Sequence, residues 1–309
     1  MSSCLITGGA GNLACQLSRV LSERHEKLIL VDIAEAPRER LPGNAIYERA
    51  DLSDEVQVRD AIETHRPGAV IHLASLLSGG CEEDRVRAWR VNCNGTFALF
   101  ESALEHRVGT VLFTSSVAAF GGELPDPLPE DAPQWPDGLY GVTKMTCERL
   151  GVYFHRQHGL DFRCVRLPIT ISRFAAPGAA SSFASHAFIE SARHKRFTFR
   201  VAPETRLSLI YVQDSIAAMA SLLAAPAERL TRRAYSLHAM TVTPREIAAA
   251  ILKRLPEARI TFEPDPAIAR LVASWPGAMH DSRARADWGW KPQFDLDQTA
   301  KHILDELLG

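Results

Sequence analysis

The stretch Cys4-Leu5-Ile6-Thr7-Gly8-Gly9-Ala10-Gly11-Asn12-Leu13-Ala14 decides the fold, because a short apolar run passes through a glycine-rich turn into residues typical of a helix. Gly8 and Gly11 permit a tight turn, and Ala14 is small enough for the helix to lie close on the strand. Such a turn aims backbone N–H groups and the positive end of the helix dipole at one point, which favours a bound pyrophosphate. The residues predicted to lie against a dinucleotide here are Gly8, Gly11, Asn12 and Leu13.

An acidic residue follows at the distance that a dinucleotide site requires. Asp32 closes the second apolar run and lies 21 residues after Gly11. A carboxylate at this place can accept hydrogen bonds from the hydroxyls of the adenosine ribose. The same carboxylate repels a 2′-phosphate, and no Arg follows it directly. The sequence therefore predicts NAD rather than NADP as the cofactor.

Strand-like and helix-like segments alternate through the first half of the chain. This alternation predicts an α/β fold of the Rossmann type, a doubly wound parallel sheet with helices on both faces. The predicted strands after the first are Lys27–Val31, Ala45–Tyr47, Ala69–Leu73, Thr110–Thr114 and Phe162–Leu167. The predicted helices are Leu13–Glu23, Glu55–Thr64, Arg85–His106 and Leu139–His158.

The second half predicts a smaller α/β lobe that binds substrate. We place the NAD-binding domain at residues 1–167 and the lobe mainly at 168–309, with some segments returning to the first domain. Asp214-Ser215 is a candidate helix cap, and Thr243-Pro244-Arg245-Glu246 has the pattern of a helix start. The predicted elements of this half are helices at 183–193, 216–224 and 296–308, and strands at 207–212 and 260–263.

Composition excludes several classes of protein. The 309 residues carry a net charge of −2 without a large basic cluster, so we expect no nucleic-acid partner. No apolar run approaches the roughly 20 residues of a membrane span, so we expect no membrane association. The six cysteines lack paired or C-x-x-C spacing, which predicts reduced thiols, and no signal peptide is visible, so we expect a cytoplasmic location. His155 and His158 lack a third ligand, and we predict no metal site.

Tyr140 and Lys144 lie four residues apart and would share one face of a helix, one turn from each other. Removing hydride from a secondary alcohol requires a base for the hydroxyl proton. The pKa of a free tyrosine is about 10, and a nearby ammonium and a positive nicotinamide ring would both lower it. Ser116, 24 residues upstream at the end of a predicted strand, would orient the substrate oxygen. We predict Ser116, Tyr140 and Lys144 as the catalytic residues.

Taken together, these motifs resemble the extended short-chain dehydrogenase/reductase family over nearly the whole chain. The residues that carry the resemblance are Thr7–Ala14, Asp32, His72-Leu73-Ala74, Asn92, Ser116, Tyr140 and Lys144. The resemblance implies an NAD-dependent oxidoreductase and a homodimer built on two helices of each protomer, Arg85–His106 and Leu139–His158. It implies that Asn92 supports the strand beside the active site and that Pro168 contacts nicotinamide. The remaining predicted cofactor contacts are Asp51, Leu52, Leu73, Ala74, Ser75, Thr114, Tyr140 and Lys144.

Two branches of this family account for different segments. Leu76-Leu77-Ser78-Gly79 and Ser274-Trp275-Pro276 resemble the short-chain type of L-threonine 3-dehydrogenase. The segments 114–117, 120–125 and 179–185 are similar to D-erythronate dehydrogenase. Both of these dehydrogenases oxidise a small hydroxy acid, so the resemblance implies a dehydrogenase of an aldonate or a β-hydroxy amino acid. Threonine dehydrogenases of this type have a Thr-Thr-Asp run where this chain has Ala180-Ser181-Ser182, which puts threonine itself in doubt. The residues predicted to bind substrate are Ser78, Ser116, Tyr140, Ser181 and Ser182.

Two other functions stay open. The alternative within the family is a nucleotide-sugar epimerase or dehydratase, whose members have an arginine where this chain has Leu207. The missing guanidinium disfavours a diphosphate ligand, although Arg206 is adjacent. A non-catalytic NAD-binding protein on the same fold is the third reading, and the presence of Ser116, Tyr140 and Lys144 argues against it.

Overall fold

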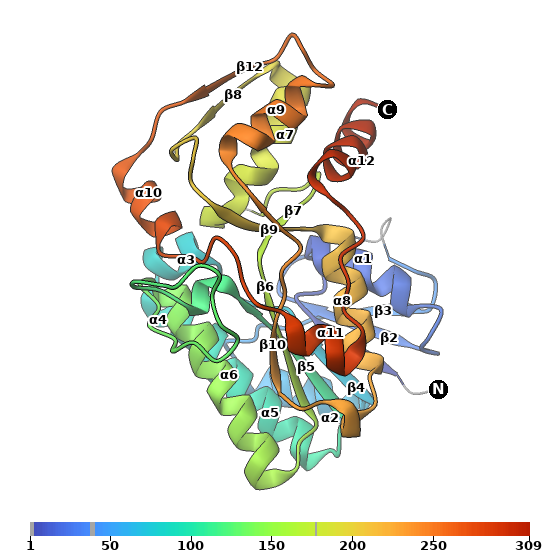
Figure 1. Cartoon of the computed structure of the whole chain (residues 1–309). Coiled ribbons are helices and arrows are strands. Elements are labelled where there is room, and N and C mark those ends of the chain that lie inside the picture. The colour runs from blue at the N-terminus through green and yellow to red at the C-terminus, as the bar shows by residue number, and fades with distance from the viewer. Residues whose placement is uncertain (1–2, 38–40, 177) are drawn as a thin grey trace.

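A seven-stranded parallel sheet forms the centre of the molecule, in a computed structural model that describes residues 3–37, 41–176 and 178–309. The strands lie in the order β10-β6-β5-β4-β1-β2-β3, with every neighbouring pair parallel (Figure 1). The predicted α/β, doubly wound fold is confirmed. The strands of this sheet are β1 (Cys4–Thr7), β2 (Leu28–Asp32), β3 (Ala45–Arg49), β4 (Ala69–His72), β5 (Thr110–Ser116), β6 (Phe162–Leu167) and β10 (Ala234–Ser236).

Helices cover both faces of this sheet because its central strands are apolar on both sides. Ile6 and Leu30 pack into one core together with α1 and α8, whereas Leu5 and Ile29 pack into a second core with α2, α5 and α6. Alternating side chains of a strand point to opposite faces, so one continuous apolar run supplies both cores. The covering helices are α1 (Asn12–Leu21), α2 (Glu55–His65), α5 (Gly95–Glu105), α6 (Leu139–His158) and α8 (Val212–Ala224).

The single helix predicted over 85–106 is interrupted. It consists of α4 (Arg85–Trp89), a π-helical turn η2 (Arg90–Asn94) and α5, and a short helix α3 (Ser78–Glu83) precedes it. A π-helical turn inserts one extra residue in the hydrogen-bond ladder and so rotates the side chains that follow. Asn92 lies in this turn. Periodicity alone does not reveal such an insertion, because the apolar pattern continues through it.

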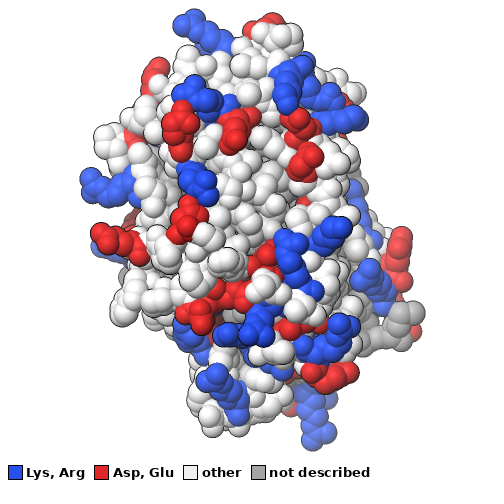
Figure 2. All heavy atoms as spheres, in the orientation of Figure 1, with Lys and Arg blue, Asp and Glu red and all other residues white. Residues whose placement is uncertain are grey.

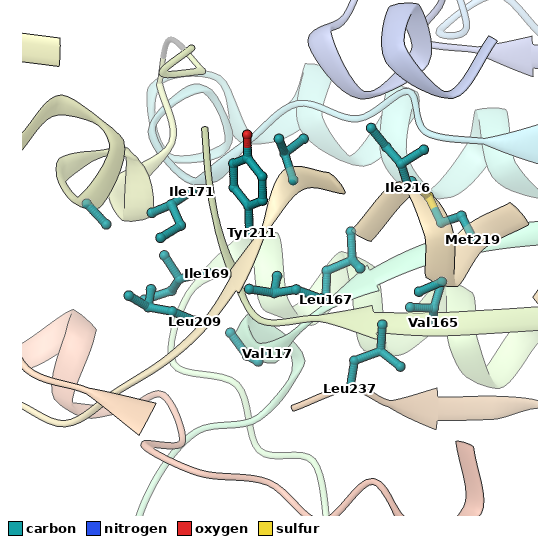
Figure 3. Packing of buried hydrophobic residues seen from close by; sticks show 14 of the residues in the cluster. Val117, Val165, Leu167, Ile169, Ile171, Leu209, Tyr211, Ile216, Met219 and Leu237 are labelled. Atoms are coloured by element: carbon teal, nitrogen blue, oxygen red, sulfur yellow. The ribbon is translucent and has the colours of Figure 1, made fainter. Parts of the chain in front are cut away.

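The smaller lobe is joined to the large sheet through the end of β6. After Leu167, Pro168 leads directly into β7 (Ile169–Ile171), which pairs in parallel with β9 (Leu207–Tyr211). Apolar side chains from both sheets meet at this junction, and Figure 3 shows Val165, Leu167, Ile169, Leu209 and Tyr211 among them. The further elements of the lobe are β8 (Arg196–Phe199), β11 (Met240–Val242), β12 (Arg259–Phe262), α7 (Phe183–His194), α9 (Pro244–Leu252), α10 (Pro266–Ala273), α11 (Ser282–Trp288) and α12 (Leu296–Leu308).

Two expectations for this half were wrong. Asp214-Ser215 is not a helix cap, because α8 already begins at Val212. The Asp214 carboxylate is buried within the helix and accepts hydrogen bonds from the backbone N–H groups of Gln293 and Phe294, at 2.9 and 3.2 Å. It therefore fixes the chain that leads into α12. The helix α10 was not predicted, because Pro264, Pro266 and Pro276 disfavour a continuous helix in this stretch. In the structure Pro266 is the first residue of α10, a position at which proline is tolerated.

Parts of the second half return to the large sheet. The strand β10 pairs in parallel with β6, and α8 packs against the same core as α1. The division of the chain at residue 167 stays a prediction, with β10 and α8 as the returning segments.

A buried ion pair fixes α6 to the sheet. Nη2 of Arg166, on β6, lies 2.7 Å from Oε2 of Glu148, on α6, and both side chains are buried. Gln134 donates a further hydrogen bond to the same oxygen at 3.0 Å. Glu148 follows Lys144 by four residues and Tyr140 by eight, so all three lie on one face of α6. The Glu148–Arg166 ion pair therefore holds that face toward the sheet.

The surface carries charges of both signs side by side, without a large field of one sign on the face that Figure 2 shows. Over the described ranges, no helix combines the length and the apolar character that a membrane crossing needs.

Candidate active site

The predicted cofactor residues gather at one edge of the large sheet. Gly8 follows β1, Asp32 ends β2, Asp51 follows β3, Leu73 follows β4, and the end of β5 carries Thr114 and Ser116. The carboxyl ends of parallel strands all lie at the same edge. The crevice between β1 and β4, where the strand order reverses, is the place at which such sheets bind ligands.

The turn after β1 fits a dinucleotide. Gly8 has φ +70°, and a Cβ atom there would lie 2.9 Å from the backbone nitrogen of Ala74, so only glycine brings the turn this close to the end of β4. Gly11 caps α1 without any side-chain hydrogen bond to the first turn. Among the described residues no side chain caps the first backbone N–H groups of α1, and groups of this kind can bind a phosphate.

Asp32 lies beside this turn. Its Oδ2 accepts a hydrogen bond from the backbone N–H of Ala10 at 3.0 Å, and its Oδ1 accepts one from Ala34 at 3.0 Å. These bonds hold the carboxylate next to the glycine turn, in the position expected of a group that binds ribose hydroxyls. At the next strand end Asp51 accepts a bond from Ser53 at 2.8 Å, and Leu52 is buried against α5.

His72 ties three elements together behind the cofactor edge. Its Nδ1 lies 2.6 Å from Oγ1 of Thr7, and its Nε2 lies 2.9 Å from Oγ1 of Thr96. The Thr96 hydroxyl donates to the carbonyl of Asn92, and Thr7 Oγ1 accepts from Ala74 N–H. His72 then donates from Nε2 and accepts at Nδ1, which describes a neutral ring with both nitrogens satisfied. Burial, with the nearby Lys144 ammonium, lowers the pKa of His72 to about 3.

We expect His72 to make the protein less stable in mild acid. The pKa of an unfolded histidine is about 6.5, so between about pH 6.5 and 3 the unfolded chain binds a proton that the folded chain does not. Stability therefore decreases as the pH is lowered through this range, by roughly 1.4 kcal/mol per pH unit for this one group. Urea unfolding at several pH values measures the slope. His72→Asn should flatten it, and an unchanged slope would contradict the assignment.

Tyr140 lies in the first turn of α6, beside Ser116. The Ser116 hydroxyl is near enough to act on the Tyr140 phenol and works to lower its pKa, and it accepts a hydrogen bond from Ala118 N–H at 3.2 Å. Nζ of Lys144 lies 5.5 Å from the centre of the Tyr140 ring and donates to the carbonyl of Thr114 at 2.9 Å. The structure thus brings the three predicted catalytic residues together.

The pKa argument made from the spacing needs correction. Burial raises the pKa of the Tyr140 phenol above its ordinary value, and the influence of Ser116 opposes this only in part. Burial also lowers the pKa of Lys144. A lysine one turn away does not overcome the loss of hydration in the protein alone. The positive charge of the nicotinamide ring is the remaining influence in favour of the phenolate.

Gly141 explains how Tyr140 comes so close to Ser116. A Cβ atom at Gly141 would overlap the backbone carbonyl of Ala118, which belongs to the turn η3 (Val117–Ala119) after β5. The absent side chain lets the start of α6 lie directly on this turn. A glycine after the tyrosine is therefore a local requirement of the site.

Three other predicted cofactor residues have mainly internal contacts. The Asn92 amide bonds both the N–H and the carbonyl of Leu76, at 2.8 and 3.0 Å, and also Thr143 at 3.0 Å. It ties the loop after β4, which contains Ser75, to α6, consistent with a supporting role. The Thr114 hydroxyl donates to the carbonyl of His72 at 3.1 Å. Pro168 is buried at the junction of β6 and β7.

A cavity of about 290 Å³ opens beside Tyr140. Of the residues predicted to bind substrate, Ser78 and Tyr140 line it. Ser116, Ser181 and Ser182 do not, and Ala179 and Ala180, of the loop that contains Ser181 and Ser182, line it instead. The complete lining is Ser78, Gly79, Glu82, Ala118, Asp137, Gly138, Tyr140, Gly141, Gly178, Ala179, Ala180, Leu271 and Trp275.

Apart from Tyr140, sequence reasoning missed the larger side chains of this lining, which are Glu82, Asp137, Leu271 and Trp275. Glu82 follows Ser78 by one helical turn, and Asp137 precedes Tyr140 by three residues, so proximity to the predicted motifs was an available signal for both. Leu271 and Trp275 come from the proline-rich stretch, where α10 had not been predicted. The loop residues and α10 belong to the smaller lobe, so the cavity lies between the lobe and the large sheet.

A site of this kind on a doubly wound sheet defines a nucleotide-dependent oxidoreductase, and comparison with known proteins makes the class specific. Residues 4–237 match the model of the NAD dependent epimerase/dehydratase family. The chain belongs to this family, and NAD is its cofactor.

Individual relatives are threonine dehydrogenases. The chain is 38% identical over 307 residues to the mitochondrial L-threonine 3-dehydrogenase of Bos taurus, covering 97% of this chain and 81% of that protein. Among solved structures it resembles L-threonine dehydrogenase from Clostridium difficile, with a TM-score of 0.93, 32% identity and coverage of 99% and 98% of the two chains. A monomeric L-threonine 3-dehydrogenase from a metagenome database superposes with a TM-score of 0.92, 26% identity and coverage of 99% and 98%. These relatives support an NAD-dependent dehydrogenase that acts on a hydroxyl substrate.

Proposed function

We propose that the protein oxidises the secondary hydroxyl of a small hydroxy acid, either a β-hydroxy amino acid of the threonine type or an aldonate such as D-erythronate, with Tyr140 as the base. The observation that carries the proposal is the cavity: Tyr140 lies in its wall, between the cofactor edge and the smaller lobe, with the Ser116 hydroxyl near enough to influence its phenol.

The division of labour follows from the geometry. When bound, NAD would supply the acceptor for the hydride and the positive charge of its nicotinamide ring. Tyr140 Oη takes the hydroxyl proton of the substrate, and the Ser116 hydroxyl donates to the same substrate oxygen and orients it. Lys144, fixed by its bond to the Thr114 carbonyl, supplies a positive charge on the buried side of Tyr140. Gly8, Gly11, Asn12 and Leu13 would hold the phosphates of NAD, and Asp32 would hold its adenosine ribose.

The nucleotide-sugar alternative finds less support in the cavity. Within the part of the chain that the structure describes, no Lys or Arg lines it. Arg206, the candidate replacement for a phosphate-binding arginine, has a side chain that is 57% exposed and pairs with Asp126 at 2.7 Å. A diphosphate would lack the bidentate cation that usually binds it.

Formation of NADH, followed at its absorption band, tests the proposal directly. We expect turnover with a panel of β-hydroxy amino acids and aldonates, and none with UDP-sugars. The epimerase alternative instead predicts NAD that remains bound through purification, with no net NADH release. Activity on UDP-sugars together with silence across the hydroxy-acid panel would reject the proposal.

We also propose a homodimer formed by the helices α4 to α6. Phe97 and Tyr153 are 46% and 50% exposed, and their rings flank Phe154 at 5.8 and 5.6 Å, so they form one apolar patch. Val86 and Trp89 add exposed apolar surface on α4. Apolar patches of this kind on helices are typical of protein interfaces.

The six free cysteines are all buried, which supports a reducing compartment, and we propose the cytoplasm.

Light scattering at micromolar concentration should give the mass of a dimer, and Phe97→Glu should give a monomer, because a charge in an apolar interface is left without a partner. Leu308→Glu is the matched control, since Leu308 is an exposed leucine near the C-terminus. A monomeric wild-type protein would overturn the proposed dimer.

A further inference from the structure

Two carboxylates stand in the wall of the cavity, each held through one oxygen. Oε1 of Glu82, on α3, accepts a hydrogen bond from the backbone N–H of Leu139 at 3.1 Å, at the start of α6. Oδ2 of Asp137 accepts one from Gly122 N–H at 2.9 Å. Among the described residues, the other oxygen of each carboxylate has no hydrogen-bond partner. Both side chains are exposed and belong to the lining of the cavity.

The charge of the wall is one-sided. Glu82 and Asp137 are the ionisable acids of the lining, and no Lys or Arg among the described residues accompanies them there. An aldonate carries a net negative charge and would meet like charges without a neutralising cation. A zwitterionic amino acid has no net charge, and its ammonium is a donor for the unused carboxylate oxygens. Ser78 is a neutral donor available for its carboxylate.

The rest of the wall is apolar, which is an independent observation. Leu271 and Trp275 of the smaller lobe, with Ala118, Ala179 and Ala180, offer carbon surface and few hydrogen-bonding groups. The additional hydroxyls of an aldonate would lie against this surface without partners, at a cost in binding. The methyl end of a β-hydroxy amino acid has no such requirement.

Building on the function proposed above, we infer that Glu82, assisted by Asp137, selects substrates that carry an ammonium group. The site then takes a β-hydroxy amino acid in preference to an aldonate or a hydroxy acid without nitrogen. Glu82 is a specificity-determining residue in this assignment: it binds the ammonium of the substrate and takes no part in hydride or proton transfer. Its bond to Leu139 N–H places this charge at the start of the helix that carries Tyr140.

The test compares L-threonine with 3-hydroxybutyrate, which lacks the amino group, and with D-erythronate. Glu82→Gln removes the charge but keeps an oxygen that can accept from Leu139 N–H, and Asp137→Asn does the same at Gly122. We expect Glu82→Gln to raise KM for L-threonine by about tenfold with kcat little changed, and to leave or lower KM for 3-hydroxybutyrate. Glu83→Gln is the matched control, because Glu83 is exposed on the same helix but does not line the cavity.

A binding experiment separates this inference from the proposed function. Competition between L-2-aminobutyrate, which has no hydroxyl to oxidise, and butyrate for the NAD-loaded protein needs no turnover. Tighter binding of the amine by the wild type, lost in Glu82→Gln, supports the inference even if no hydroxy acid is oxidised. Equal binding of the two compounds by the wild type overturns it, as does an equal loss in Glu83→Gln. Thermal unfolding checks that each variant is folded. If Glu82→Gln is unfolded, the relative affinity of the wild-type protein for L-2-aminobutyrate and butyrate decides the question.

Discussion

Tyr140→Phe is expected to lower kcat by about 10²–10⁴-fold, the usual contribution of a positioned general base. The ring remains and only the hydroxyl is lost, so the packing of α6 should persist. Because burial raises the pKa of this phenol, the hydroxyl is kept protonated in the protein alone and the variant removes no charge. We therefore expect NAD affinity and thermal stability close to those of the wild type, with the loss confined to the chemical step.

Steady-state NADH formation and titration of NAD by fluorescence measure the two quantities separately. Tyr153→Phe is the matched control, since Tyr153 belongs to the same helix but is half exposed and distant in sequence from the catalytic pair. If Tyr140→Phe retained kcat within tenfold of the wild-type value, the role of Tyr140 as the base would be wrong.

Glu148→Gln should destabilise the protein by about 3–5 kcal/mol. The substitution keeps the size of the side chain and an acceptor oxygen, but it leaves the Arg166 guanidinium buried without a counter-charge. Nε and Nη2 of Arg166, on β6, both donate to Glu148, on α6, at 3.0 and 2.7 Å, and both side chains are buried. Urea unfolding near neutral pH measures the loss in the free energy of unfolding.

Two further variants make this expectation specific. Asp305→Asn breaks an exposed pair with Lys301 on α12 and should cost less than about 1 kcal/mol. The double variant Glu148→Leu/Arg166→Met removes both buried charges and should regain much of the lost stability. A loss in Glu148→Gln no larger than that in Asp305→Asn would show that the buried pair does not hold α6 in place.

The cofactor edge could be predicted from the sequence because each of its parts is local. The turn at Gly8 and Gly11 follows its strand directly, and Asp32 is the last residue of the next one. A parallel sheet then brings such strand ends to one edge whatever the details of packing. The helix Leu139–His158 has the predicted bounds, and with it the spacing of Tyr140 and Lys144.

The cavity and its electrostatics could not be predicted in the same way. Its wall combines residues from 78 to 275, and only the folded chain shows that Ala179 and Ala180, rather than Ser181 and Ser182, face it. The pKa of Tyr140 depends on how much water reaches the phenol, which spacing does not encode. The π-helical turn at Asn92 is likewise hidden, since it changes the direction of side chains without changing their apolar pattern.

The cavity has one wall from the edge of the large sheet and one from the smaller lobe, and the two walls differ in how far they can change without affecting catalysis. Tyr140, Gly141 and Ala118 are bound to the sheet edge and to each other, so a change there disturbs the chemistry itself. Leu271 lies on a short helix of the smaller lobe that contributes neither a strand end of the large sheet nor a part of the glycine turn. Substitutions on that helix can change which hydroxy compound binds without changing the residues for nucleotide binding and proton transfer. New substrate preferences can therefore evolve on this fold through single substitutions.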